Sequence, residues 1–261
     1  MAVLALPRRE PVASAIYLDA DPNGLAIANG VLYVADGETG TIMRADSTPL
    51  AVIDSGGIEI GNRIGGLAAA PDGALYVTRL GYGSAGAIFR INPDGSTIEL
   101  DLPTEPWRLG IACRGRAVYS TQFYKNDDGP CDGSIIRIVD GRISTIARGF
   151  GKPVGLAWVG DSLLVTDAKQ RGVFSVDGRR YVRALAAPDA RPDSICALDR
   201  DSALVTTYDA EFKRGAVLRV WLDGRSREIA HGTWEPRGIA TDGELAFVSV
   251  RRGGRVLVIT L

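Results

Sequence analysis

The sequence is poor in the residues on which several common catalytic sites depend. It holds one histidine, His231, and three cysteines, Cys113, Cys131 and Cys196, among 261 residues. A single histidine, placed beside Gly232 in a predicted outer strand or turn, indicates a surface role and excludes His-rich zinc sites, Ser-His-Asp triads and Cys-His pairs. An odd number of cysteines, two of them inside apolar strand-like runs, predicts reduced, structural thiols.

Charge excess and long apolar runs are also missing. The 30 Lys and Arg residues are balanced by 31 Asp and Glu residues, for a formal net charge of −1. A general nucleic-acid binder normally shows a basic excess. No run approaches the roughly 18 apolar residues of a membrane span, and the short apolar run at the start has no basic residues before it, unlike a secretory signal. We therefore expect a cytoplasmic protein that binds neither nucleic acid nor membrane.

What the sequence does contain is a repeated hairpin. Residues 21–36 read Asp-Pro-Asn-Gly-Leu-Ala-Ile-Ala-Asn-Gly-Val-Leu-Tyr-Val-Ala-Asp. The pair Asn29-Gly30 suits the positive φ angles of a tight turn, and the flanking apolar runs are typical of buried strands. The copies recur about every 40 to 45 residues, the period of four-stranded propeller blades. They lie at 63–78, 107–121, 153–167, 192–206 and 236–249.

Each hairpin is followed by a glycine-led apolar strand, as in 40–44 and 86–90, and usually by an Asp-Gly reversal and a more polar strand. The sixth copy stops at Leu261, before its fourth strand. We predict that residues 13–18 supply that strand, because closing the ring leaves no long exposed sheet edge. The predicted fold is all-β: a six-bladed β-propeller with four-stranded antiparallel blades, one domain over 1–261, whose N-terminal strand closes the last blade.

This topology predicts where a site lies. In each blade the inner strand begins, and the second strand ends, at the same rim, so polar residues at these points gather around the axis. The inner strands begin at Asn23, Gly65, Leu109, Val154, Asp193 and Arg237, with Arg63, Arg108, Lys152 and Arg191 beside them. The second strands end at Asp36, Arg79, Gln122, Asp167, Tyr208 and Arg251.

A ring of guanidinium groups suits a carboxylate or phosphate, because the guanidinium fork binds oxyanions in bidentate fashion. The candidate catalytic residues are Asp36, Asp167 and Asp193, as proton acceptors or orienting groups. The candidate substrate-binding residues are Asn23, Arg63, Arg79, Arg108, Gln122, Tyr124, Lys152, Tyr208, Arg237 and Arg251. The alternative is that polar residues at strand ends only satisfy neighbouring backbone. An acidic stretch at 126–132 is either a calcium loop or a solvated loop.

The hairpin at 22–36 and the Gly-Thr-Ile-x-Arg unit at 40–44 resemble NHL-repeat and SMP-30/gluconolactonase-like propellers, over essentially the whole chain. In the SMP-30 and gluconolactonase group, a Glu, two Asn and an Asp hold a divalent cation on the axis. The resemblance matches Asp193 to the aspartate, with Asn23 at the place of the glutamate and Leu109 and Val154 at those of the asparagines. Apolar side chains cannot replace oxygen ligands of a hard cation. We therefore expect no metal cofactor, and a single axial divalent cation is the alternative.

The chain also resembles strictosidine-synthase-like propellers, which act on organic substrates without an axial metal. The leading hypothesis is thus an enzyme that binds a small anionic or polar organic substrate, most simply a carboxylate, at the axial face. The expected reaction is isomerase-, cyclase- or lyase-type acid–base chemistry without a metal. The alternatives are a metal-dependent lactonase or esterase of the SMP-30 type and a non-catalytic NHL-type module that binds a ligand or a protein.

Overall fold

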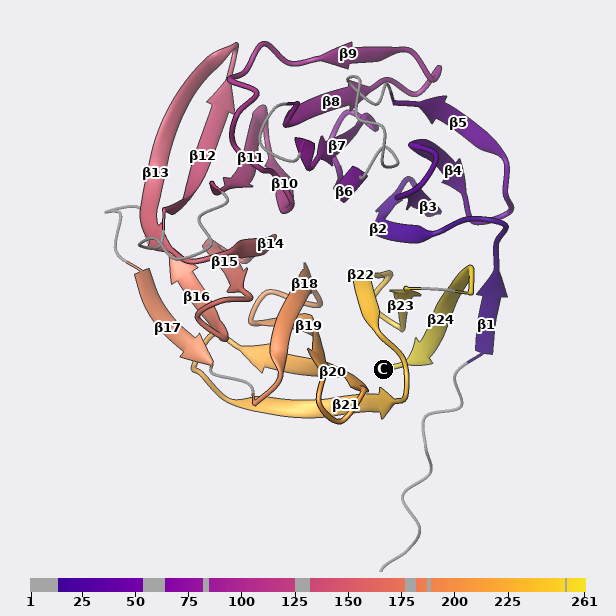
Figure 1. Ribbon diagram of the computed structural model, residues 1–261, viewed down its shortest axis with the longest axis vertical. Coiled ribbons are helices and arrows are strands. Elements are labelled where there is room, and N and C mark those ends of the chain that lie inside the picture. Colours follow the sequence, from indigo (N-terminus) through magenta and orange to yellow (C-terminus); the bar gives the residue numbers. More distant parts are fainter. Residues whose placement is uncertain are drawn as a thin grey trace, which may run out of the picture.

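In the computed structural model of the protein, six small sheets stand around a central opening (Figure 1). The structure describes residues 14–53, 64–81, 85–124, 132–176, 182–186, 189–251 and 253–261. Each sheet has four antiparallel strands, and the predicted six-bladed β-propeller is confirmed. Within the described ranges the chain forms no helix long and apolar enough to cross a membrane.

The blades follow one another in chain order, each built from its inner strand outward. The first blade is β2 (Pro22–Ala28), β3 (Val31–Asp36), β4 (Thr41–Arg44) and β5 (Pro49–Val52). The second is β6 (Ile64–Ala69), β7 (Leu75–Arg79), β8 (Ala87–Ile91) and β9 (Thr97–Glu99). The third is β10 (Ile111–Arg114), β11 (Ala117–Gln122), β12 (Gly133–Val139) and β13 (Arg142–Phe150). The fourth is β14 (Pro153–Val159), β15 (Ser162–Asp167), β16 (Gly172–Val176) and β17 (Val182–Ala186). The fifth is β18 (Arg191–Ala197), β19 (Ser202–Asp209), β20 (Arg214–Trp221) and β21 (Ser226–Gly232). The sixth is β22 (Pro236–Thr241), β23 (Leu245–Val250), β24 (Arg255–Thr260) and, from the other end of the chain, β1 (Ser14–Tyr17).

The ring closes as the missing fourth strand predicts. Strand β1 pairs antiparallel with β24, with Ala15 opposite Leu257 and Tyr17 opposite Arg255. The backbone N–H of Leu18 donates to the carbonyl of Gly254 at 2.7 Å and continues the pairing. Figure 1 shows β1 lying beside β24 at the junction of the first and last blades. The outer edge of the sixth blade is therefore covered by the N-terminal strand.

The continuous apolar runs are explained by blades that pack face to face. On β3 the adjacent residues Val34 and Ala35 are both fully buried although they point to opposite faces of the sheet. Val34 lies in a cluster with Ala240 of the sixth blade, and Ala35 lies in one with Ile64 of the second. A strand buried on both faces needs apolar side chains at every position rather than at alternate ones.

Hydroxyl groups on the second strands join neighbouring blades near the axis. In the second blade, Thr78 Oγ1 accepts from the N–H of Gly66 at 2.9 Å and donates to the carbonyl of Leu109 in the third at 2.8 Å. Thr206 links the fifth blade to the sixth in the same way. A Cβ on Gly66 would lie 2.4 Å from the Leu109 carbonyl oxygen. Glycine is therefore required where the neighbouring inner strand passes so closely.

Ser249 closes this series between the last and first blades. Its Oγ accepts from the N–H of Gly238 at 2.7 Å and donates to the carbonyl of Asn23 at 2.5 Å. We expect Ser249→Ala to lower the free energy of unfolding by about 1 to 2 kcal/mol, because a buried N–H loses its acceptor. Urea denaturation measures the effect, with Ser226→Ala at the exposed start of β21 as the control. Equal stabilities of the two variants would contradict this role.

Candidate functional site

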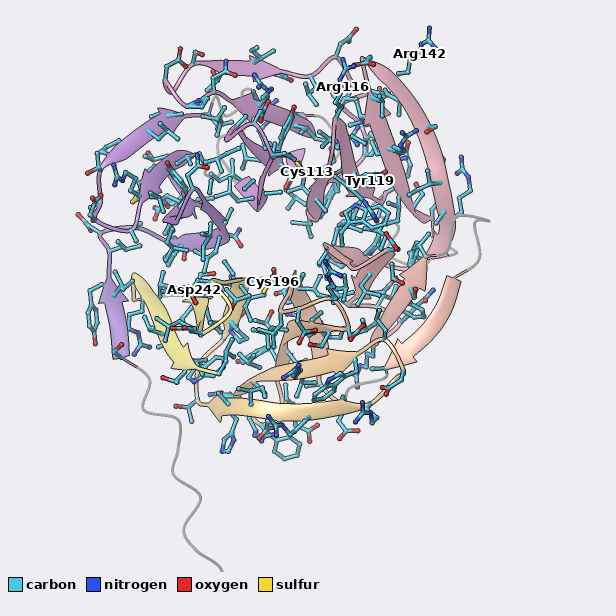
Figure 2. The ribbon with its side chains drawn as sticks, turned by 180° about the vertical axis from the view of Figure 1, so that it is seen from behind. Cys113, Arg116, Tyr119, Arg142, Cys196 and Asp242 are labelled. Atoms are coloured by element: carbon cyan, nitrogen blue, oxygen red, sulfur yellow. The ribbon has the colours of Figure 1, made fainter. Side chains whose placement is uncertain are left out.

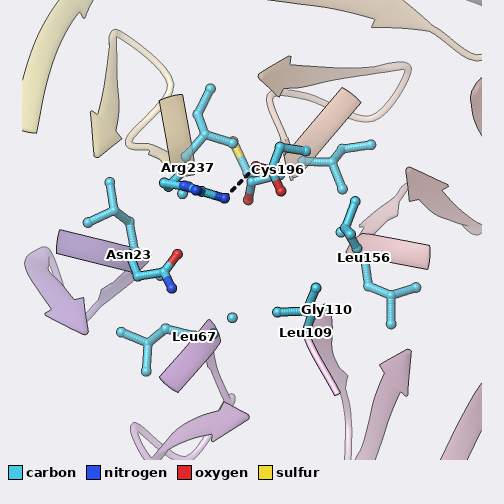
Figure 3. Close-up of a pocket in the computed structure, with 18 of the residues that line it drawn as sticks. Asn23, Leu67, Leu109, Gly110, Leu156, Cys196 and Arg237 are labelled. Atoms are coloured by element: carbon cyan, nitrogen blue, oxygen red, sulfur yellow. Dashed lines mark ion pairs between the residues drawn. The ribbon is translucent and has the colours of Figure 1, made fainter. Parts of the chain in front are cut away.

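An axial cavity of about 810 Å³ runs between the six inner strands (Figure 3). All six residues predicted at the starts of the inner strands line it. The pairing register shifts near the start of several of these strands, for example between Pro192 and Ile195 and between Pro236 and Ile239. Such irregularities re-aim side chains, and they coincide with Asp193 and Arg237. Figure 3 shows Asn23 and Arg237 extending over the opening.

Charged side chains lie mainly on one side of the mouth. The first three blades contribute Asp21, Asn23 and mostly glycine and aliphatic residues to the lining. The fourth to sixth blades contribute four cations and two carboxylates, so the positive charge on this side exceeds the negative by two. These residues are Lys152, Arg191, Asp193, Glu235, Arg237 and Arg251. Tyr208, at the end of β19, lies among them.

A chain of ion pairs connects part of this charged side. Arg237 Nη1 lies 3.6 Å from Asp193 Oδ2, and Arg237 Nη2 donates to Glu235 Oε1 at 2.9 Å. The same oxygen of Glu235 accepts from Arg251 Nη1 at 3.1 Å. Figure 3 marks an ion pair of Arg237 with a dashed line. Glu235 therefore shares its charge between two arginines and limits how closely Arg237 pairs with Asp193.

Sequence reasoning missed Glu235, although a signal was present. Four inner strands begin at or next to a proline, and the residue before each proline lines the cavity: Asp21, Lys152, Arg191 and Glu235. The residue before proline is restricted to extended backbone, which carries the chain straight into the strand. Glu235 and Asp21 lie two positions before the predicted strand-start residues Arg237 and Asn23, just as Lys152 and Arg191 lie two positions before Val154 and Asp193.

Two of these cations have no direct side-chain partner among the described residues. Within the described part of the chain, the side chains of Lys152 and Arg191 have no hydrogen bond and no ion pair within 4.0 Å. Asp193 still acts on both electrostatically. All three side chains are half-buried. Two partly dehydrated cations without a close partner have the chemistry to bind an anion.

Burial shifts the pKa values of two groups at the mouth toward each other. It raises the pKa of the Asp193 carboxyl above its ordinary value of 3.8, although Arg237, Arg191 and Lys152 oppose the shift. Burial also lowers the pKa of the Lys152 ammonium below its ordinary value of 10.5, against the pull of Asp193. Titratable groups shifted in opposite directions in one site are suited to acid–base exchange.

Asp167 is fully buried and lies outside the lining of the axial cavity. Its Oδ2 accepts from the N–H of Gly151 at 2.6 Å, and its Oδ1 accepts from that of Lys152 at 3.0 Å. The N–H groups of Lys169 and Gln170 each donate to the same Oδ1 at 2.9 Å. Four backbone donors therefore surround this carboxylate, which anchors the segment that carries Lys152.

Asp36 has the same role in the first blade. It is buried and accepts from the N–H of Asp21 at 3.1 Å, from that of Glu38 at 3.0 Å and from the hydroxyl of Thr39. It lines a smaller hollow beside the axial cavity rather than the cavity itself. The geometry of Asp36 and Asp167 is that of loop anchors, the alternative interpretation of polar residues at strand ends. Of the three candidate catalytic aspartates, Asp193 alone lines the axial cavity.

Arg79 and Arg108 were predicted to bind substrate, but neither lines the cavity. Arg79 is buried, donates from Nε to the carbonyl of Ala85 at 2.7 Å and lies 5.0 Å from the ring centre of Phe89. Arg108 is fully buried and donates to the carbonyl of Pro103 at 2.7 Å. Burial lowers the pKa of Arg108 to about 10. Both guanidinium groups are thus directed into the protein.

The remaining candidates divide between the cavity and the protein around it. Gln122 accepts from Arg108 and donates to Ser134, outside the cavity lining, and Tyr124 is exposed outside it. Arg63 and residues 126–131 of the acidic stretch lie outside the described residues. The candidates that do line the cavity are Asn23, Lys152, Asp193, Tyr208, Arg237 and Arg251.

The two described cysteines hold little thiolate at neutral pH, and His231 lies at the surface. Cys113 and Cys196 are free and line the cavity toward the ends of β10 and β18, on facing sides of the opening (Figure 2). Burial raises the pKa of both thiols to about 12, so the reactive thiolate is scarce. His231 is exposed on β21, with its Nδ1 2.8 Å from Glu228. Cys131 lies outside the described residues.

The axial residues do not fit the four-oxygen cation site of the SMP-30 group. Leu109 and Val154 stand at two of the four positions and line the cavity there. Across the described ranges, no three His, Cys, Asp or Glu residues gather into a metal-binding group. Asn23 directs its amide nitrogen to the carbonyl of Ile64 at 2.8 Å. Asn23 and Asp193 alone provide too few ligands for calcium, which takes six to eight oxygens.

Comparison with known proteins supports the fold. No family model and no curated protein matches the chain. A gluconolactonase from Xanthomonas campestris is similar, with a TM-score of 0.76 and 17% identity over 95% of this chain and 89% of that one. Virginiamycin B lyase from Staphylococcus aureus is similar, with a TM-score of 0.66 and 18% identity over 95% and 99%. Regucalcin, a calcium-binding protein from Agrobacterium tumefaciens, has a TM-score of 0.66 and 14% identity over 91% and 89%. The predicted resemblance to SMP-30/gluconolactonase-like propellers is confirmed at the level of the fold.

Proposed function

We propose that this propeller is an enzyme that binds a small organic anion, most simply a carboxylate, at the charged side of the axial cavity. It would transform that molecule by acid–base chemistry without a metal. The observation that carries the proposal is the group formed by Lys152, Arg191, Asp193 and Arg237 in one half-buried mouth. Gluconolactonase and a lyase are among the similar structures, so this fold accommodates enzymes that act on small molecules.

Anion binding follows from the excess of positive charge. Arg191 and Lys152 have no direct side-chain partner among the described residues; Arg191 shares β18 with Asp193, and Lys152 directly precedes β14 of the neighbouring blade. An incoming carboxylate would satisfy both cations, and partial burial strengthens such contacts because water screens them less. Arg191 would bind in bidentate fashion and set the orientation.

The chemistry rests on Asp193 and Lys152. A carboxyl whose pKa is raised and an ammonium whose pKa is lowered exchange protons near neutral pH more readily than ordinary groups do. With the anion held between them, one group would remove a proton and the other would return it. Isomerisation, cyclisation and elimination all need this exchange and no redox partner.

The alternatives have less support. A metal-dependent lactonase would need oxygen ligands where Leu109 and Val154 stand. A protein-binding module needs no open shaft, whereas this cavity of about 810 Å³ has room for a small organic molecule. No feature of the described residues specifically favours either alternative.

Calorimetric titration with succinate at low ionic strength tests the binding proposal, with the uncharged succinamide as the matched ligand. We expect succinate to bind and succinamide not to bind. Arg191→Ala should weaken succinate binding about tenfold or more, the loss of one charge-assisted pair. Arg227→Ala on the exposed face of β21 serves as the control. No succinate binding, or an equal effect of the two variants, would contradict the proposal.

A further inference from the structure

Lysine is rare in this chain, and one lysine lies in the cavity. Only four of the 30 cationic residues are lysines: Lys125, Lys152, Lys169 and Lys213. Among the described residues, every other cation in the cavity lining is an arginine. Arginine binds carboxylates at least as well as lysine does but remains charged in proteins, whereas a buried lysine can lose its proton and act as a nucleophile. A lysine at this position can therefore supply a neutral, nucleophilic amine, which an arginine cannot.

The surroundings of Lys152 suit a nucleophilic amine. Its backbone is held on both sides, by the N–H to Asp167 at 3.0 Å and by the carbonyl, which accepts from Ala168 at 2.9 Å. The side chain is half-buried, lines the cavity and has no hydrogen bond or close ion pair among the described residues. Arg191 and Arg237 act on it electrostatically and disfavour its charged form. A lysine beside other cations is a known arrangement for an activated amine.

We propose that Lys152 is a covalent catalyst whose amine condenses with the carbonyl of a 2-oxo carboxylate to form an imine. This inference rests on the proposed anion site: when Lys152 acts as the neutral amine, Arg191 and Arg237 would hold the carboxylate that lies next to the carbonyl. With the carboxylate held there, the adjacent carbonyl carbon faces the amine. A monocarboxylate without the carbonyl would bind at the same place but would form no bond.

Lys152 and Asp193 together supply the protons that imine formation needs. The lone pair of the neutral Lys152 amine attacks the carbonyl carbon, the C=O π electrons move to the oxygen, and a proton passes from the amine nitrogen to that oxygen to give a neutral carbinolamine. Asp193, in its protonated form, transfers a proton to the hydroxyl group, which leaves as water while the C=N bond forms. The products are the protonated imine, water and the Asp193 carboxylate. The shifted pKa values of both residues support the protonation states that the step needs.

Borohydride trapping with pyruvate as the probe tests the imine. The full chain is incubated with pyruvate, reduced with sodium borohydride, and measured by intact mass and peptide mapping. We expect one reduced pyruvyl adduct on Lys152, and excess succinate should suppress it by competition. Lys152→Arg keeps the positive charge and should lose the adduct. Lys213→Arg, on an exposed turn, should keep it.

No adduct, or an adduct spread over Lys169 and Lys213, would overturn the imine. Succinate titration of wild type and of Lys152→Arg separates this failure from that of the proposed function. If succinate binds both proteins but no adduct forms, the covalent role is wrong and the anion site stands. If succinate does not bind the wild type, the proposed function fails as well.

Discussion

Asp167→Ala is expected to lower the free energy of unfolding by about 4 kcal/mol, as estimated for a buried carboxylate that leaves several donors without an acceptor. The carboxylate is fully buried and accepts from four backbone N–H groups, which would all lose this acceptor. Guanidinium denaturation of the purified protein measures the change.

Asp161→Ala is the matched control, since Asp161 lies in the same blade but its side chain is 97% exposed in an ion pair with Arg114. We expect that control to change stability by less than about 0.5 kcal/mol. If Asp167→Ala keeps wild-type stability, the carboxylate is not the anchor that its hydrogen bonds indicate. Because Asp167 holds the backbone of Lys152, the variant should also weaken succinate binding in the fraction that remains folded.

Asp193→Asn is expected to tighten anion binding about tenfold at pH 8. Unlike Asp167→Ala, this variant removes no acceptor of backbone hydrogen bonds among the described residues. The carboxylate competes with an incoming anion for Arg237, Arg191 and Lys152. Removing one negative charge close to the ligand is worth roughly one pKa unit, or about 1.4 kcal/mol. Titration with propane-1-sulfonate measures it, because this anion stays ionised across the pH range used.

The same variant should lose the pH dependence of binding. Burial raises the pKa of Asp193 above 3.8, so the wild-type carboxyl is neutral at low pH and becomes charged as the pH rises through that raised pKa. Affinity for the sulfonate should therefore be highest at low pH and should fall through that range. The asparagine variant should stay flat there, with Asp161→Asn behaving like the wild type. A wild-type affinity that does not change with pH would contradict this competition.

Stability should follow the same titration. A carboxyl whose folded pKa lies above its unfolded value contributes fully below pH 3.8, and that contribution is lost as the pH rises through the folded pKa. We therefore expect the Asp193→Asn variant to lack one component of the decline in wild-type stability with rising pH. Denaturation curves across that pH range provide the measurement.

Much of the fold was predictable because its determinants are local. Asn29 and Gly30 adopt φ angles of 51° and 75°, the left-handed values that a tight hairpin turn needs. The apolar runs beside them predicted strands buried on both faces, as Val34 and Ala35 show. The unpaired last hairpin predicted that an N-terminal strand closes the ring, and β1 does so.

The sequence predicted where the site lies but not which side chains form it. Asp167 and Asp193 both follow from the repeat as polar residues at the axial rim, and the sequence pattern does not distinguish them. Asp167 is enclosed by four backbone donors, whereas Asp193 stands where the register of its strand shifts and faces the cavity. Arg108 was predicted to line the cavity but is buried in the protein. Glu235 was not predicted, yet it accepts a hydrogen bond from Arg237 at the mouth.

The sequence by itself determined the number of blades, the strand pairing and the rim at which polar residues collect. These depend on turn residues, side-chain polarity and repeat spacing, which act over a few neighbouring positions. The tertiary structure decided which carboxylate anchors a loop and which one lies in the cavity beside Lys152. That choice depends on which backbone donors and charged groups from other blades surround each side chain, and those neighbours exist only once the ring has closed.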